Sequence, residues 1–222
     1  FHANGIDIWI IVYEDGAPNI HAYLLTCNGI DMSKSKISPV GRIVTAQQIR
    51  GGIAMSWDGK MLATTFPLAP GSGRDEALIT YDFNNVTGEF SGRKNRDPGD
   101  GNSLGGYELI FSPNNDSIIV TTLSSGGAVW VFDIEDETFT KHTIPGAVIS
   151  TIEIGADGLY YFTNYVPGAT GKVQTSSDFD NYTDVMYNSD SVMASSASLS
   201  NMYIPPAEEP DIQEVQPYCN DK

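Results

Sequence analysis

The sequence predicts an all-β fold: a β-propeller of about four blade-like units that form part of a larger ring, followed by an extended acidic linker. Three segments of the same layout predict it, and they are Gly51–Phe66, Gly105–Leu123 and Ala147–Tyr165. Each has a small or glycine-rich start, an apolar strand, a polar turn and a second apolar strand. Such internal repetition is typical of propellers, in which one supersecondary unit recurs around a ring.

The polar turns of these segments set the period of the repeat. Asp58, Asn114 and Asp157 follow one another at intervals of 56 and 43 residues. These intervals suit one four-stranded blade per repeat, with loop insertions in the earlier ones. Asp58 and Asp157 each precede a glycine, and Asp-Gly favours the tight hairpin turns that need positive φ.

Further strands follow each repeated hairpin in the same order. They are expected at Ala77–Phe90 and Ala128–Thr140, with a weaker copy at Lys172–Thr183. An earlier copy places one strand at Asp7–Glu14 and the next at His21–Ile30. These segments alternate β-branched and aromatic residues, and none shows a sustained 3.6-residue apolar stripe, so strands are predicted throughout.

Two domains are expected, with a boundary near Pro205. Residues 1–204 are predicted to be the propeller blades of a partial ring, and residues 205–222 a proline- and acid-rich linker or tail. Pro205-Pro206 and the acidic residues after them favour a semi-extended segment. Leu199–Ile204 is interpreted as a last strand or docking element before this linker.

Charge and composition exclude several classes of function. The formal net charge is −16 and the isoelectric point is about 4.3. Nucleic acids and anionic membrane surfaces bind basic proteins, so neither is an expected partner. No apolar run reaches the ~18 residues of a membrane-spanning helix. The two cysteines, Cys27 and Cys219, lie far apart, and their spacing does not decide whether they pair.

The acidic loops are the candidate metal sites. Residues 97–102 and 178–184 carry closely spaced carboxylates, and their candidate ligands are Asp97, Asp100, Asp178 and Asp180. Such oxygen ligands suit Ca²⁺, but neither loop matches the helix-flanked calcium loop. Ordinary polar turns are the favoured explanation of both segments.

Inner-strand carboxylates and aromatic residues are the other candidates for a site. Glu108 and Glu153 lie in equivalent strands. They stand at different distances from the turn that follows each strand, so they do not occupy the same position of the repeat. Either could face a central channel. The aromatic residues are interpreted mainly as packing between blades, with a sugar-stacking surface as the alternative; they are Trp57, Tyr107, Tyr160, Tyr161 and Tyr165.

No catalytic residues are assigned from the sequence. His2, His21 and His142 occupy three different positions of the repeat, and the chain has no Gly-x-Ser-x-Gly motif for a nucleophile. His2 is interpreted as a structural residue of its turn.

The order of three motifs resembles a known family. Phe1–Glu14 with His21–Ile30, then Gly106–Thr122, then Ile152–Tyr165 are similar to stretches in large secreted β-propeller proteins of Bacteroidota, some of them gliding-motility-associated. The resemblance covers roughly residues 1–165. Trp57 departs from it, because that family usually has proline there. It implies export by a type IX secretion route and a location at the outer cell surface, and it supplies no catalytic residues.

The chain starts inside a hairpin, without a preceding first strand. Upstream blades of a longer protein, or a partner chain, are therefore expected to complete the ring.

The function predicted from these observations is a non-catalytic extracellular module for binding, adhesion or assembly, with a protein or glycan at the cell surface as partner. One alternative is a lactonase-like or glycan-processing propeller enzyme with a metal in its central channel. Another is a structural subunit completed by a partner chain.

Overall fold

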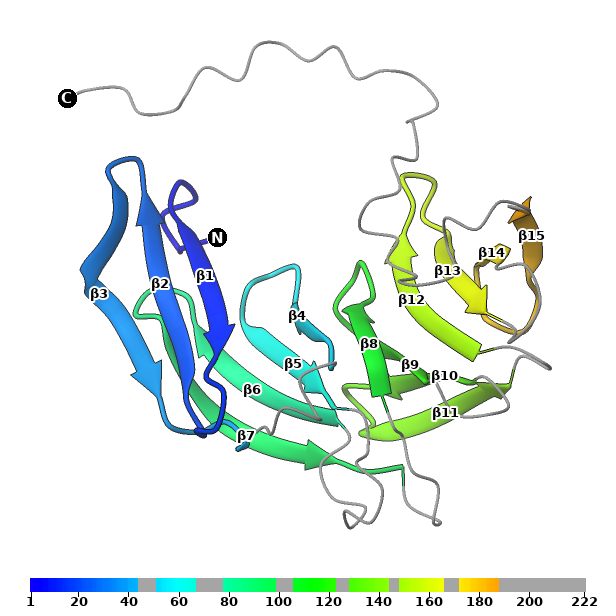
Figure 1. Ribbon diagram of the computed structural model, residues 1–222, viewed down its shortest axis with the longest axis horizontal. Helices are drawn as coiled ribbons and strands as arrows, with labels where there is room; N and C mark the ends of the chain where they lie inside the picture. Colours follow the sequence, from blue (N-terminus) through cyan, green and yellow to red (C-terminus); the bar gives the residue numbers. More distant parts are fainter. Residues whose placement is uncertain are drawn as a thin grey trace.

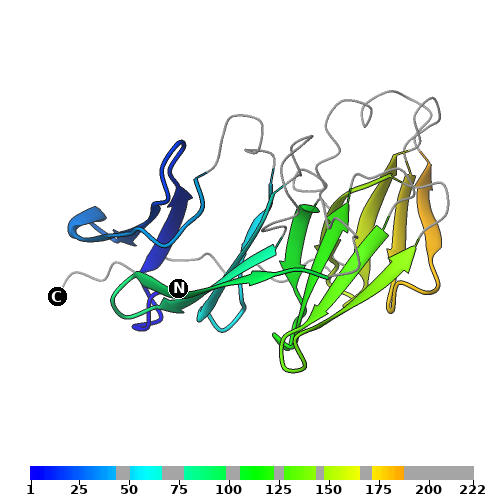
Figure 2. The same cartoon turned by 90° about the horizontal axis from the view of Figure 1, so that it is seen from below.

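The computed structural model describes residues 1–43, 51–66, 78–98, 106–122, 128–143, 148–165 and 172–187. Side chains are described in these ranges except at 148–150, 164–165, 172–173 and 183–187. The described residues form strands in four antiparallel sheets that follow one another along an arc (Figure 1). The view from below shows the same succession of sheets (Figure 2).

The strands run through each sheet in chain order. Sheet 1 contains β1 (Ile8–Tyr13), β2 (Ile20–Thr26) and β3 (Gly29–Ser38). Sheet 2 contains β4 (Ile53–Met55), β5 (Met61–Thr65), β6 (Leu78–Asn84) and β7 (Glu89–Arg96). Sheet 3 contains β8 (Gly106–Phe111), β9 (Ser117–Thr122), β10 (Ala128–Asp133) and β11 (Thr138–Thr143). Sheet 4 contains β12 (Val148–Ile154), β13 (Tyr160–Tyr165), β14 (Lys172–Ser176) and β15 (Thr183–Tyr187).

This arrangement confirms the predicted all-β repeat. Each of the three repeated segments forms the first hairpin of a sheet, β4–β5, β8–β9 and β12–β13. The weak copy at Lys172–Thr183 contains β14 and the start of β15, which pair with each other. The expected strand at His21–Ile30 is divided by a turn, where Cys27 lies exposed between β2 and β3.

Apolar side chains pack between neighbouring sheets, and each interface has its own core. Between sheets 1 and 2 the buried residues include Trp9, Leu24 and Tyr81. Between sheets 2 and 3 they include Leu78 and Phe132. The interface of sheets 3 and 4 contains Ile119, Val129, Ile152, Phe162 and Phe179. Successive side chains of a strand point to opposite faces, so the middle strands contribute to the cores on both sides.

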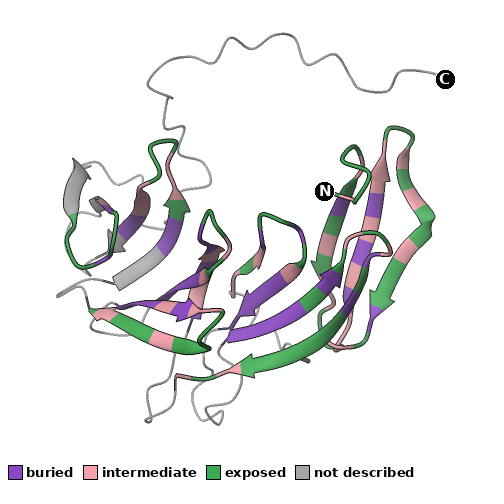
Figure 3. Ribbon diagram, turned by 180° about the vertical axis from the view of Figure 1, so that it is seen from behind, coloured by how far each residue is buried: buried purple, intermediate pink, exposed green. Residues whose placement is uncertain are grey.

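Burial changes from the middle of each sheet to its outer strand. In β5 Leu62 belongs to the core shared with sheet 1, and the next residue, Ala63, belongs to the core shared with sheet 3. The outer strands β3, β7 and β11 are mostly exposed (Figure 3). This pattern of burial explains the composition of the strands: the middle strands are apolar on both faces because both are buried, and the outer strands are polar because they face solvent.

Four equivalent turns precede four strands: one turn comes before β1 in sheet 1, and the others come before β5, β9 and β13, the second strands of sheets 2 to 4. In each turn the last residue donates its backbone N–H to the carbonyl oxygen three residues earlier, at 2.9 to 3.0 Å; the turns are His2–Gly5, Ser56–Gly59, Ser112–Asn115 and Gly155–Gly158. The last residue has a φ between 61° and 79° in all four. Sheets 2 to 4 have an inner strand before this turn. Sheet 1 has none among the described residues, so it is one strand short.

Candidate functional site

The inner strands of sheets 3 and 4 bring two carboxylates together. Glu108 lies in β8 and Glu153 in β12. The Glu108 carboxylate accepts a hydrogen bond from the backbone N–H of Ile152, so it links the two sheets. Both strands are irregular near these residues, because the register shifts between Gly106 and Leu109 in β8 and between Ile149 and Ile152 in β12.

The two carboxylates share an environment that disfavours charge. Burial raises the pKa of Glu108 from 4.5 to about 7, and the nearby charge of Glu153 adds to the effect, while the hydrogen bond from Ile152 opposes it. Burial also raises the pKa of Glu153, although its side chain is more exposed to solvent. Glu108 is therefore partly protonated near neutral pH.

A shallow groove of about 140 Å³ lies beside this pair, and three neighbouring sheets contribute to it. Its walls are Ala54, Met55, Trp57, Ile110, Phe111, Glu153 and Ile154. The groove has one carboxylate, one indole ring and an otherwise apolar lining. Such a combination can hold an apolar stem that carries a cation, since carboxylates and aromatic faces both attract positive charge.

Trp57 is held in place by the next sheet while its ring stays open to solvent. Its backbone N–H donates to Asn115 Oδ1 at 2.7 Å, and its indole Nε1 donates to the Phe111 carbonyl oxygen at 3.3 Å. The residue is nevertheless 68% exposed. Trp57 therefore contacts the next blade, as its interpretation as a residue between blades predicts, but its ring is not part of a buried core.

The candidate metal ligands lie apart from this groove. Asp97 is exposed after β7, and Asp100 lies outside the described residues. Asp178 Oδ1 accepts the backbone N–H groups of Asp180 and Asn181 at 3.0 Å, as expected of an ordinary polar turn. Asp180 Oδ1 lies 2.9 Å from His142 Nδ1. Among the residues that could be searched, no three His, Cys, Asp or Glu side chains group as metal ligands would.

The three histidines lie in separate local contacts. His2 Nδ1 accepts the backbone N–H of Asn4, and its ring lies 5.7 Å from that of Trp9, which agrees with a structural role in the first turn. His21 Nε2 is 2.8 Å from Glu14 Oε2.

In the described part of the chain, no helix is long and apolar enough to span a membrane.

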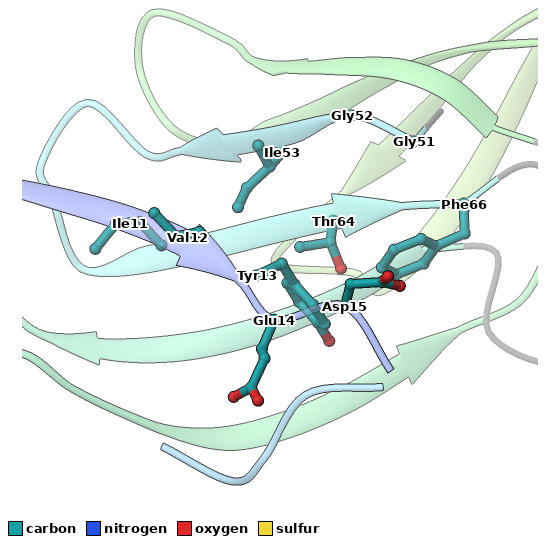
Figure 4. A pocket seen from close by; sticks show the side chains of 10 residues that line it. All are labelled: Ile11, Val12, Tyr13, Glu14, Asp15, Gly51, Gly52, Ile53, Thr64 and Phe66. Atoms are coloured by element: carbon teal, nitrogen blue, oxygen red, sulfur yellow. The ribbon is translucent and has the colours of Figure 1, made fainter. Parts of the chain in front are cut away.

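A second and larger cavity, of about 320 Å³, lies between sheets 1 and 2. Figure 4 shows its lining: Ile11, Val12, Tyr13, Glu14 and Asp15 from β1 and the turn after it, and Gly51, Gly52, Ile53, Thr64 and Phe66 from sheet 2. Sequence reasoning missed this cavity.

Comparisons with known proteins agree on the fold. No protein-family model matches the sequence, and no curated protein matches it. Among solved structures, the chain is similar to TolB of Acinetobacter baumannii, with 16% identity, a TM-score of 0.53 and coverage of 84% of this chain and 42% of that one. A proposed TolB of Agrobacterium tumefaciens has 14% identity and a TM-score of 0.52, with 84% and 60% covered.

A proposed 6-phosphogluconolactonase of Bacteroides fragilis has 15% identity and a TM-score of 0.52, with 83% and 51% covered. The chain thus spans about half the length of these proteins. At such identities the likeness establishes architecture alone. The four stacked antiparallel sheets and these matches together show that the chain has a β-propeller fold.

Proposed function

We propose that this chain is a non-catalytic binding module whose groove beside Trp57 recognises a protein partner that bears lysine or arginine side chains. The observation that supports it is the groove itself, in which an exposed indole and the Glu153 carboxylate face the same small space. Tryptophan is one of the residue types that are enriched among the side chains contributing most to binding energy in protein interfaces.

Electrostatics favours a basic partner over an acidic one. The net charge of −16 attracts a cationic surface and increases its rate of encounter. A guanidinium over the Trp57 ring gains about 0.5–1 kcal/mol at an exposed site. The ion pair with Glu153 adds to this, and a cation nearby also favours the charged form of Glu108. Binding is therefore expected to strengthen between pH 6 and pH 8, as Glu108 loses its proton.

A tetra-arginine amide peptide tests the proposal by isothermal titration at 0.15 M salt. We expect Trp57→Ala and Glu153→Gln each to weaken binding several-fold. Glu135→Gln is the matched control, because it removes the same charge from an exposed turn between β10 and β11. If all three variants bind as the wild type does, the peptide is held by net charge alone and the groove is not the site.

The location of the module belongs to the same proposal. We propose that it acts outside the cytoplasm, at a bacterial outer surface reached by a type IX secretion route. The support is the resemblance of residues 1–165 to secreted propellers of Bacteroidota. Antibody labelling of intact cells is expected to detect the protein in its native host, and labelling only after lysis would contradict this location.

A second candidate function is a propeller enzyme, and one observation favours it. Glu108 has a pKa near 7 and lies beside a second carboxylate, which is how an acid–base pair is often arranged. Assays with a sugar lactone and with soluble glycans separate the two candidates. Turnover by the wild type that is lost in Glu108→Gln would support the enzyme and contradict the non-catalytic proposal.

A further inference from the structure

Two side chains that depart from the repeated turns contact each other beside the groove. The second residue of the four equivalent turns is alanine or proline in three cases and tryptophan in one; in chain order these residues are Ala3, Trp57, Pro113 and Ala156. The last residue, which has a positive φ, is glycine in three turns and Asn115 in the other. Neither the Trp57 ring nor the Asn115 amide is therefore required by the turn that carries it.

Asn115 holds the turn of Trp57 against the neighbouring sheet. Its Oδ1 accepts the backbone N–H of Trp57 at 2.7 Å, and the Trp57 indole Nε1 donates to the Phe111 carbonyl oxygen at 3.3 Å. Trp57 is thus held both at its backbone and at its ring nitrogen, while 68% of the residue stays exposed. A ring that is oriented before a ligand arrives loses less conformational entropy on binding.

The groove beside this ring has few groups that can replace the water around a cation. Among its described lining residues, Glu153 carries the single charged acceptor, and apart from Trp57 the rest are apolar: Ala54, Met55, Ile110, Phe111 and Ile154. The carbonyl oxygen of Phe111 already accepts the indole N–H of Trp57. A space of about 140 Å³ with this lining suits one long side chain that is charged only at its end.

Such a lining favours a guanidinium over an ammonium. The guanidinium is planar and weakly hydrated, it stacks on aromatic faces, and its fork of N–H donors matches a carboxylate. It can therefore lie against the Trp57 ring and donate to Glu153 at the same time. A lysine ammonium is a compact and strongly hydrated charge with three donors, so one carboxylate leaves part of its hydration unreplaced.

We propose that the groove is selective for arginine: the guanidinium stacks on Trp57 and donates to Glu153, and Asn115 is the positioning residue that orients the indole. This inference rests on the proposed function, which it narrows from basic side chains in general to arginine side chains of the partner. Asn115 acts through Trp57 and does not itself touch the ligand.

The ratio of two affinities tests the selectivity on the full chain. Tetra-arginine amide and tetra-lysine amide carry the same charge, so the net charge of −16 attracts both alike. In isothermal titration at 0.15 M salt, the Kd of the arginine peptide should be about five-fold lower than that of the lysine peptide. Trp57→Ala should make the two values nearly equal. Val86→Ala is the matched control, because Val86 is 60% exposed in the turn between β6 and β7, and it should keep the ratio.

Asn115→Gly tests the positioning role. Glycine occupies this place in the other three turns, so the substitution keeps the positive φ and removes only the hydrogen bond to Trp57. The ratio should fall about twofold. The chain has three tryptophans, and the indole N–H signal that Trp57→Ala removes from a nitrogen–proton correlation spectrum should shift in Asn115→Gly. Asn115→Asp keeps an Oδ acceptor and should retain the wild-type ratio.

The outcomes separate this inference from the proposed function. Equal affinities of the wild type for both peptides, with both weakened by Trp57→Ala, would leave the groove as the binding site and overturn its selectivity. A ratio that persists in Trp57→Ala would also overturn the selectivity, because it would then arise elsewhere. Binding of both peptides that Trp57→Ala leaves unchanged would overturn the proposed function as well. A ratio and an indole signal that are unchanged in Asn115→Gly would overturn the role of Asn115.

Discussion

Glu108 is a carboxylic acid whose protonation near neutral pH depends on the fold. Its pKa of about 7 arises from burial first and from Glu153 second. Because the folded state holds its proton more tightly than the unfolded state does, the folded state binds more protons between pH 4.5 and 7. Stability therefore falls as the pH rises through this range, and the loss is complete above pH 7.

Glu108→Gln should remove this loss. We expect the variant to gain on the order of 1–2 kcal/mol relative to the wild type between pH 5 and pH 8, after allowance for solvent screening of a partly exposed group. Urea unfolding at pH 5, 6.5 and 8 measures it. Glu135→Gln should follow the wild type, and a difference between Glu108→Gln and wild type that does not change with pH would contradict the assignment.

Replacing Trp9 or Trp57 by alanine should have very different effects on the stability of the protein. Trp9 is buried, its indole Nε1 donates to the Asn85 carbonyl oxygen at 2.9 Å, and its ring packs edge-on against Phe83. Trp9→Ala should cost about 3–5 kcal/mol. Trp57→Ala should cost less than about 1 kcal/mol, because the ring is mostly exposed. Chemical unfolding compares them, and equal losses would contradict the burial described for either residue.

At the scale of elements, the inner strands of sheets 2 and 3 approach closely at a glycine. A Cβ on Gly52 would lie 2.9 Å from the Leu109 backbone nitrogen and 3.0 Å from the Glu108 Cα. Both atoms belong to the backbone of β8, so neither can rotate away. Gly52→Ala should push β4 and β8 apart and destabilise the protein by about 1–3 kcal/mol in thermal unfolding. An unchanged melting temperature would contradict this packing.

Turns and strands could be predicted from the sequence because their signals are local. Asp58-Gly59 and Asp157-Gly158 determine their turns through positive φ at the glycine, and Asn115 adopts the same conformation without one. The proximity of Glu108 and Glu153 could not be predicted from their spacing, because the registers of β8 and β12 shift next to these residues. The exposure of Trp57 could not be predicted either, since composition does not show where a core ends.

The expectations for the C-terminal part of the chain stay predictions. The boundary at Pro205, the acidic linker of residues 205–222 and any pairing of Cys27 with Cys219 depend on residues outside the described ranges. Asp100 of the first acidic loop lies outside them as well.

At the scale of the whole molecule, the stack of sheets has unequal ends. The middle sheets bury both faces, whereas sheet 1 leaves an apolar face and a strand edge uncovered. A chain that exposes such a surface tends to associate through it. Completion of sheet 1 is therefore the central claim about how this propeller is built.

Hydrogen exchange of the full chain, followed by mass spectrometry, tests that claim most directly. If sheet 1 is completed, the amides of β1 should exchange as slowly as those of the central strands β5 and β9. If β1 in the wild type exchanges as fast as the outer strands β3, β7 and β11, its inner edge is open and the claim is contradicted.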